Sequence, residues 1–387
     1  MSDRAGKSKL RYARRGQMSL AWAAASYFAL QLMISTVSDD LVPALRDPEY
    51  GCKFALLKTR LAEAPRRPLM LILGSSRSEL GLLPTEFPFK SSPQEQPLVF
   101  NFALTGAGPV RELQTLKRLL AAGIRPRHVL VEFHPLLLHG GAGFGELAAL
   151  DASRLDWPDI RLLTRYIDRP QKLRLDWCRS RLAPCFFQRF CWLHCFAPCW
   201  LAPNDPLFIW NRLDRCGGLQ FELPEGSERQ FDQRVADSIR EYAPAFDRFH
   251  VTELPDRALR ELLSLCREEG IAAALFLMPE EDRFRAAYST EARAELEAYL
   301  RTLQSEHHCA VLDAENSRLV ADLAASNFVD GHHLSAQGAR RFSAWFGAEI
   351  LAYMETHPGI ERRLPLESRK AGELATKREP GPSPQLR

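Results

Sequence analysis

The apolar and polar positions follow two different periods along most of the chain. Short, continuously apolar runs that end near Gly or Pro are typical of strands buried on both faces of a parallel sheet. Longer segments with apolar residues every three to four positions are typical of amphipathic helices. The pattern predicts strands within residues 68–74, 97–106, 127–135, 271–279 and 309–314, and helices within residues 37–67, 110–124, 258–270 and 289–306 and after residue 335. This alternation predicts a parallel sheet covered by helices on both faces.

Residues from about 136 to 250 interrupt the alternation. They are rich in Trp, Arg, Pro and Cys and show no regular succession of strands and helices. A connection of this length in a compact domain usually has structure and a function of its own. We therefore expect a mostly helical insertion after the third strand, forming a cap beside the functional edge of the sheet.

The N-terminal pattern is different. Residues 18–36 are apolar except for Ser19, Ser26, Gln31 and the final Ser35 and Thr36, and about 20 residues suffice to cross a bilayer as a helix. The preceding residues 1–17 contain five closely spaced basic residues: Lys7, Lys9, Arg11, Arg14 and Arg15.

Basic flanks stay on the cytoplasmic side of a membrane. The expected arrangement is a cytoplasmic stub at residues 1–17, a single transmembrane anchor at 18–36 and an extracytoplasmic domain at 37–357. A cleaved signal peptide is the main alternative, but "ISTVSDD" offers no small-residue cleavage site. A second alternative to the anchor is an N-terminal helix that is buried inside the protein.

Composition narrows the class of protein. With 46% hydrophobic and 26% charged residues the 387-residue chain is globular, although residues 358–387 are charged, then Pro-rich, and predicted to be disordered. A net charge of +3, with scattered basic residues, does not indicate nucleic-acid binding. The spacing of Cys191, His194, Cys195 and Cys199 fits buried small side chains better than zinc, whose usual ligand pairs are absent. No metal and no cofactor are predicted.

Chemically useful residues follow the first and last predicted strands. Ser75 and Ser76 come directly after the first strand, and Asp330, His332 and His333 come after the last. Ligand sites in open α/β sheets lie at the carboxyl ends of the strands, so these residues are expected at one edge. A serine hydroxyl needs an adjacent base to act as a nucleophile, and an aspartate can orient that base. The plainer alternative is a strand-to-helix turn capped by serine.

These segments resemble the SGNH (GDSL-like) hydrolase superfamily. "GSS" resembles its first block and "NFALTG" its second, while "DGHH" followed by "LSAQGA" resembles its last. The resemblance implies a three-layer α/β/α, flavodoxin-like parallel sheet, here with the helical insertion after the third strand. It also implies Ser76 as nucleophile, His333 as base, Asp330 as its orienter, and the backbone N–H groups of Ser76 and Gly106 as oxyanion donors.

The chain departs from the superfamily pattern at the third block. An Asn that donates to the oxyanion should follow the third strand, but the chain reads "VEFHP" there. Loss of one such donor typically lowers the rate about 100- to 1000-fold. His134 lies in that region, and Asn101, His134 and Arg283 are candidate substrate-binding residues. An exposed charged loop is the alternative for Arg283.

Together these features predict a serine-dependent ester hydrolase or acyl (acetyl) transferase in the cell membrane. Its expected partners are the membrane, through the N-terminal helix, and an acylated small molecule, glycan or lipid ester of the envelope. The rival hypothesis is a non-catalytic envelope scaffold or binding protein with a degenerate SGNH fold. The missing Asn favours the rival, and the retained Ser, Asp and His oppose it.

The basic flank and the apolar run generate a prediction about topology. A reporter that is active only in the cytoplasm, fused after Pro358, should be silent, because residues from Val37 onward should lie outside. The same reporter fused before Met18 should be active. Activity of the fusion after Pro358 would contradict the anchor.

Overall fold

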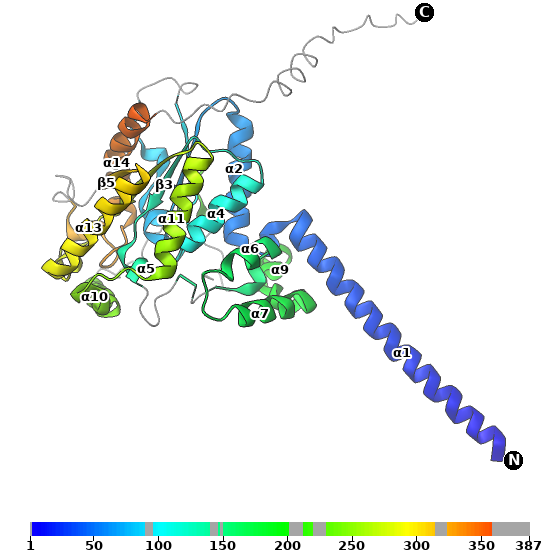
Figure 1. Cartoon of the computed structure of the whole chain (residues 1–387). Helices are drawn as coiled ribbons and strands as arrows, with labels where there is room; N and C mark the ends of the chain where they lie inside the picture. Colours follow the sequence, from blue (N-terminus) through cyan, green and yellow to red (C-terminus); the bar gives the residue numbers. More distant parts are fainter. Residues whose placement is uncertain are drawn as a thin grey trace, which may run out of the picture.

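A computed structural model describes residues 2–89, 96–139, 146–147, 150–200, 212–219, 230–313 and 323–357. Its centre is a sheet of five parallel strands in the order β2-β1-β3-β4-β5 (Figure 1). The strands are β1 Leu69–Leu73, β2 Leu98–Asn101, β3 His128–Glu132, β4 Ala272–Leu277 and β5 Ala310–Asp313. This is the flavodoxin-like strand order, and the predicted fold class is confirmed.

The buried strands contact helices on both faces of the sheet. Along β1, Leu69, Leu71 and Leu73 pack into one core, whereas Met70 and Ile72 pack into the other, as the alternation of side chains in a strand requires. The first face is covered by α2 Pro48–Glu63, α4 Pro109–Ala121, α11 Glu253–Glu268 and α13 Thr290–His307. The second face is covered by α14 Ala336–Thr356 and by Leu82 and Leu83, which directly follow the short helix α3 Ser76–Gly81. All five strands lie within the segments predicted from the pattern.

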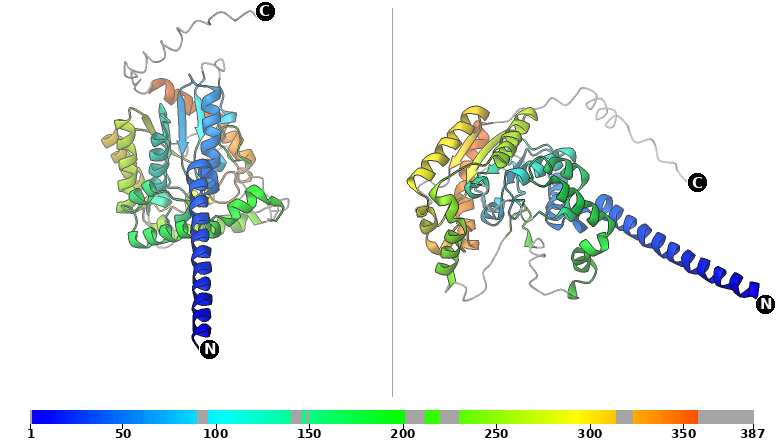
Figure 2. Two further views of the ribbon diagram at one scale, coloured as in Figure 1. Left: turned by 90° about the vertical axis from the view of Figure 1, so that its right-hand side faces the viewer. Right: turned by 60° about the horizontal axis from the view of Figure 1, so that its bottom comes forward.

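The N-terminal helix α1, Ser2–Thr36, extends away from the sheet domain (Figures 1 and 2). The helical segment Arg14–Asp39, which runs from α1 into the turn that follows it, is long and apolar enough to cross a membrane, with a mean hydropathy of 1.4 over an 18-residue window. Only 11% of that window is buried inside the protein, which distinguishes α1 from a core helix. A π-helical turn at Val37–Leu41 and a 3₁₀ turn at Pro43–Leu45 then connect α1 to α2.

The segment between β3 and α11 contains helices that pack in two places. Near the end of α1 lie α6 Trp157–Leu163, α7 Pro170–Leu182, α8 Pro184–Phe187, α9 Arg189–Phe196 and the 3₁₀ turn η5 Pro198–Trp200. On the other side of the domain, α10 Phe231–Asp247 packs near α13 and α12 Asp282–Ala286, while α5 Pro135–His139 directly follows β3. The tail predicted to be disordered, residues 358–387, lies outside the described residues.

Candidate active site

The first part of the site is the turn between β1 and α3. Ser75 caps α3, its hydroxyl accepting a hydrogen bond from the Arg77 backbone N–H at 3.2 Å. Ser76 is the first residue of the helix and is half-buried. A Cβ atom at Gly74 would lie 2.6 Å from both Glu132 Oε2 and Ser78 Oγ, so the close approach of these groups requires glycine.

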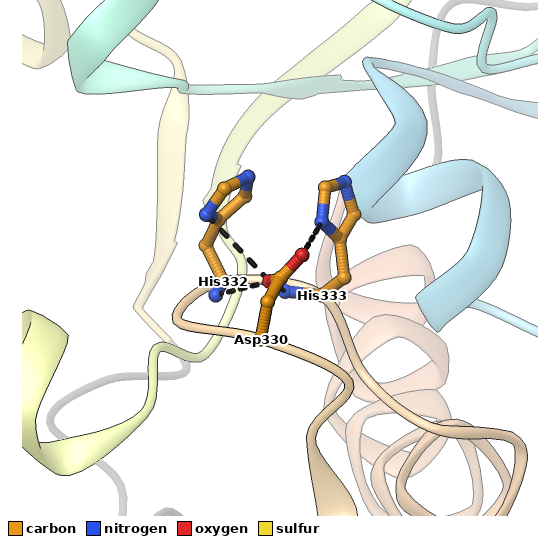
Figure 3. Close-up of side chains that lie close together, drawn as sticks. All are labelled: Asp330, His332 and His333. Carbon is orange, nitrogen blue, oxygen red and sulfur yellow. Dashed lines mark hydrogen bonds and ion pairs between the residues drawn. The ribbon is translucent and has the colours of Figure 1, made fainter. Parts of the chain in front are cut away.

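The second part is the loop before α14 (Figure 3). One carboxylate oxygen of Asp330 accepts hydrogen bonds from the backbone N–H groups of His332 at 2.9 Å and His333 at 2.8 Å. The other oxygen lies 2.9 Å from His333 Nδ1. Burial opposes the charged form of Asp330, but the hydrogen bond with His333 and the two adjacent imidazoles outweigh burial and lower the pKa of this carboxyl group. Asp330 is thus an ionised acceptor that shapes the loop and fixes the ring of His333.

The two parts meet at a hydrogen bond between Ser76 and His333. Ser76 Oγ lies 2.8 Å from His333 Nε2, although 257 residues separate the two in sequence. Because Asp330 accepts at Nδ1, the proton of a neutral His333 belongs on that nitrogen, which leaves the Nε2 lone pair facing the serine hydroxyl. The arrangement can remove the proton from Ser76 as its oxygen attacks a carbonyl carbon.

His332 is a packing residue of the same loop. Its ring contacts Tyr242 on α10 edge-on, at 5.1 Å between ring centroids, and lies 5.2 Å from the ring of Phe284. Burial, then the neighbouring His333, lowers the pKa of His332 well below its ordinary value. Asp330, His332 and His333 are residue types that bind metal ions. However, both ring nitrogens of His333 are already engaged by Asp330 and Ser76, so the site is better described as a serine–histidine–aspartate chain.

Glu132, at the end of β3, is a site residue that the sequence analysis missed. Its carboxylate is buried and accepts hydrogen bonds from the Ser75 backbone N–H at 2.8 Å, the Ser75 hydroxyl at 3.0 Å and the Ser78 hydroxyl at 2.5 Å. Glu132 therefore fixes the turn that presents Ser76. A charged residue ending the apolar run "HVLVE" was the only signal in the sequence.

Arg77 extends this buried network to the next strand. It is 2% exposed, and its guanidinium lies 3.8 Å from Glu132 Oε1 and 3.2 Å from Glu280 Oε1, while donating to the Met278 carbonyl at 2.8 Å. Met278 and Glu280 follow β4. The side chain that follows Ser76 thus links the carboxyl ends of β3 and β4.

Gly106 lies in the loop after β2, next to the turn that contains Ser76. The Leu104 backbone N–H donates to the Gly74 carbonyl at 2.9 Å, which holds the two loops together. Gly106 adopts a φ of +64° and is exposed. The left-handed conformation favours glycine at this position.

Two buried carboxylates hold the residue before Gly106. The Thr105 backbone N–H donates to Glu49 Oε1 at 2.5 Å, and its hydroxyl donates to Glu79 Oε2 at 2.9 Å. Lys53, fully buried, lies 3.0 Å from Glu79 Oε1 and donates to the Ala103 carbonyl at 2.5 Å. Burial, followed by repulsion from Glu79, raises the pKa of Glu49 to about 7. The position of this loop therefore depends on α2 as well as α3.

Asn101 is a structural residue, which corrects the expectation that it binds substrate. It is fully buried, and its amide nitrogen donates to the carbonyls of Ser78 at 2.8 Å and Leu82 at 2.7 Å. Its side-chain oxygen accepts from the Ala103 backbone N–H at 3.0 Å. Because these bonds lie inside the protein, Asn101 connects β2 to α3 and is not accessible to a ligand.

The other two predicted substrate contacts differ in their surroundings. His134 is 6% exposed, and burial together with the charges of Arg77, His332 and His333 lowers its pKa well below the ordinary value. Its Nδ1 atom has no hydrogen-bond partner within the described part of the chain. Arg283 instead forms ion pairs with Glu281 at 2.8 Å and Asp232 at 2.9 Å. A contact of either residue with substrate stays a prediction.

Comparison with known proteins gives two similarities. Residues 32–153 match the model of a family described as a protein of unknown function (DUF1574). No curated protein matches the chain. Among solved structures, the chain is similar to the crystal structure of the lipase/acylhydrolase from Enterococcus faecalis, with 12% identity and a TM-score of 0.31 over 77% of this chain and 100% of the other. Function is therefore inferred below from the side-chain geometry.

The buried network around Glu132 generates a prediction about stability. Glu132→Ala should lower the free energy of unfolding by about 3–5 kcal/mol, because Ser75 and Ser78 lose their acceptor and Arg77 loses a neighbouring charge. Urea denaturation of the purified chain measures this. Glu297→Ala, which removes an exposed carboxylate on α13, is the control and should change stability by less than about 0.5 kcal/mol. Equal effects of the two changes would contradict the role assigned to Glu132.

Proposed function

We propose that this protein is a serine-dependent ester hydrolase or acyl transferase. The observation that carries the proposal is the continuous hydrogen-bonded chain from Ser76 through His333 to Asp330. A serine placed at a helix N-terminus, with a base on its hydroxyl and a carboxylate on that base, is the arrangement that activates serine for acyl transfer.

The reaction follows from the roles of the three side chains. His333 Nε2 takes the hydroxyl proton as Ser76 Oγ bonds to the ester carbonyl carbon, and Asp330 stabilises the imidazolium that forms. Collapse of the tetrahedral intermediate breaks the bond to the alcohol oxygen, which receives the proton from His333. Water or an acceptor hydroxyl then gives its proton to His333 and attacks the acyl-serine. Collapse of this second intermediate breaks the bond between the acyl carbon and Ser76 Oγ, which takes the proton back from His333, and an acid or a new ester is released.

The negative charge of the intermediate needs donors close to Ser76. We assign this role to the backbone N–H groups of Ser76 and Gly106. The first supporting observation is that Ser76 begins α3, where backbone N–H groups have no partner within the helix. The second is the hydrogen bond from Leu104 to Gly74, which holds the Gly106 loop against the nucleophile turn.

His134 is our candidate for the donor that the missing Asn would supply. It follows β3, the strand whose carboxyl end carries that Asn in the superfamily. Burial lowers its pKa and favours a neutral ring, and it lies two residues after Glu132, whose carboxylate holds the turn that presents Ser76. A neutral imidazole has one N–H group to donate and adds no charge that would compete with His333.

The predicted cap beside the site has support in two segments of the insertion. In α10, Arg234 Nε donates to the Val329 carbonyl at 2.7 Å, and Tyr242 contacts His332, so this helix packs on the loop of Asp330. Residues 212–219 lie against α3, where the Leu219 N–H donates to the Glu79 carbonyl at 3.0 Å. We propose that these segments shape the substrate entrance.

The N-terminal helix supports a membrane location for this activity. We propose that α1 crosses the cell membrane once, with its basic end in the cytoplasm and residues 37–357 outside. An acylated envelope component, either a glycan or a lipid ester, is then the expected substrate class.

The catalytic chain predicts that its members act as a unit. Ser76→Ala, His333→Ala and the double variant should each lower kcat for a short-chain ester by a similar factor, on the order of 10⁴–10⁶, because the effects of triad members do not add. His332→Phe keeps the ring packing and should cost much less. Steady-state kinetics on a panel of acyl esters, with and without glycan acceptors, measures both effects.

The same variants separate the enzyme from a non-catalytic scaffold. A serine-directed fluorophosphonate should label the wild-type chain at Ser76 and leave Ser76→Ala unlabelled. Full ester activity after Ser76→Ala would refute the mechanism, because no other atom can replace that hydroxyl. A wild-type chain that is neither labelled nor active would favour the scaffold.

His134 generates a separate prediction. His134→Ala should lower kcat by about 10²–10³, the cost of one oxyanion donor, with a smaller change in KM. His134→Gln keeps a side-chain N–H group and should recover part of kcat. Thermal unfolding of both variants is the control for a purely structural loss. Equal kcat in all three proteins would contradict the assignment.

A further inference from the structure

Exposed apolar side chains are concentrated at one place in the molecule. Within the described residues, every large apolar side chain that is exposed lies on α1, at Val42 just after it, or on the helices from α6 to η5. The helices that cover the sheet, α2, α4, α11, α13 and α14, expose none. Five of these side chains follow one another on α8, α9 and η5 and form what we call the aromatic patch: Phe186, Phe187, Phe190, Phe196 and Trp200.

The aromatic patch adjoins the point where α1 meets the domain. Gln31 of α1 is 3% exposed, and its side-chain oxygen accepts a hydrogen bond from the Cys185 backbone N–H at 3.3 Å. Ser38, in the turn after α1, donates to Gln188 Oε1 at 2.6 Å. Buried polar contacts of this kind fix α8 and α9 against α1, so the patch has a defined height along the helix.

That height matches the surface of a bilayer. Along an α-helix, the distance from Arg15 to Gln31 is about 24 Å at ~1.5 Å per residue, and the hydrocarbon core is about 30 Å thick. With Arg15 at the cytoplasmic boundary, Gln31 lies about 6 Å short of the opposite boundary, and Ser35, at about 30 Å, reaches it. Phe186 and Phe187 on α8, the helix held at this level, are exposed where aromatic rings are favoured in membrane proteins.

The charges next to the aromatic patch fit the same location. The guanidinium of Arg189 lies over the rings of Phe186 at 4.2 Å and Phe190 at 4.5 Å from their centroids. A long basic side chain that covers aromatic rings and ends in a charge is suited to the boundary between acyl chains and phosphate groups. Because α8 contacts α1, whose own apolar side chains are exposed, the location of the patch favours a lipid surface over a protein partner.

The active-site edge is close to this end of α1. Thirteen positions after Thr36, Glu49 accepts the hydrogen bond from Thr105, next to Gly106. The turns between them are held by ion pairs of Asp39 with Arg181 on α7 and of Asp47 with Arg118 on α4. Figure 1 shows α7 at the same end of the domain as α5, which follows the carboxyl end of β3, and α1 runs away from that end.

We propose that the aromatic patch docks on the outer leaflet of the bilayer that α1 crosses, and so holds the active site above it. The substrate is then an ester carried by a component of that membrane, rather than a soluble ester. The docking rests on the exposed side chains and on the proposed crossing of α1, while the substrate class rests on the proposed activity.

Fluorescence quenching tests the docking without any need for activity. The full chain is reconstituted in phosphatidylcholine vesicles whose acyl chains are brominated, and tryptophan emission is compared with unbrominated vesicles. Trp200→Phe should lower the quenched fraction, because it removes a tryptophan in contact with lipid. Trp345→Phe, on α14, is the matched control and should raise the fraction, because it removes a tryptophan away from lipid. A rise with Trp200→Phe as well would overturn the docking.

Activity in the same vesicles tests the substrate class. The double variant Phe186→Ser and Phe196→Ser should lose about tenfold in rate on a lipid ester in the vesicles and keep its rate on a soluble short-chain ester. Equal loss on both esters, or none on either, would overturn the membrane-borne substrate. If the wild-type chain hydrolyses neither ester while Trp200 is quenched, the proposed enzyme fails and the docking stands.

Discussion

The carboxylate of Glu132 is the interaction on which the site depends. It lies at the end of β3, inside the protein, and accepts hydrogen bonds from the turn that begins α3. A buried carboxylate is costly unless donors surround it, and the donors here are the Ser75 backbone N–H and the hydroxyls of Ser75 and Ser78. Because Arg77 faces both Glu132 and Glu280, the ends of β1, β3 and β4 form one polar unit. Ser76 is presented by this unit and is the half-buried residue at its surface.

The parallel sheet brings the remaining groups to that unit. All five strands have their carboxyl ends at one edge, so the loops that follow them meet there. The loop after β2 brings Gly106, and the segment after β5 brings Asp330 and His333. Asp330 both shapes its loop, through two backbone N–H groups, and orients the imidazole. The same side chain thus sets the conformation of the loop and the orientation of the His333 ring, and its lowered pKa reflects the donors that surround it.

The N-terminal helix and the site are joined by α2 and by the turns that precede it. Glu49 and Lys53 on α2 contact the loop of Gly106, directly or through Glu79, and α2 begins a short distance after α1 ends. Ion pairs from Asp39 and Asp47 hold the intervening turns against α7 and α4. A protein anchored through α1 would therefore carry its active-site edge at a fixed height and tilt relative to the membrane, which a flexible linker could not achieve.

Much of the fold and the core of the site could be predicted from the sequence. Buried parallel strands are mostly apolar, so the runs in "LMLIL" and "HVLVE" predict two of the strands. The segments "GSS" and "DGHH" follow predicted strands, and the carboxyl ends of parallel strands lie at one edge of the sheet. Three features needed the tertiary structure. Asn101 resembles a ligand contact in sequence, but its amide bonds to α3 inside the protein. In the sequence Glu132 is only the last residue of a strand. Its role could not be predicted, because its hydrogen-bond partners are 54 to 57 residues away. The sequence shows the residues of the aromatic patch only as part of an insertion. The hydrogen bonds of Gln31 and Gln188 show that this part of the insertion packs against the end of α1. Local periodicity encodes which backbone forms and which residues are buried, whereas hydrogen bonds between distant segments depend on how those segments pack.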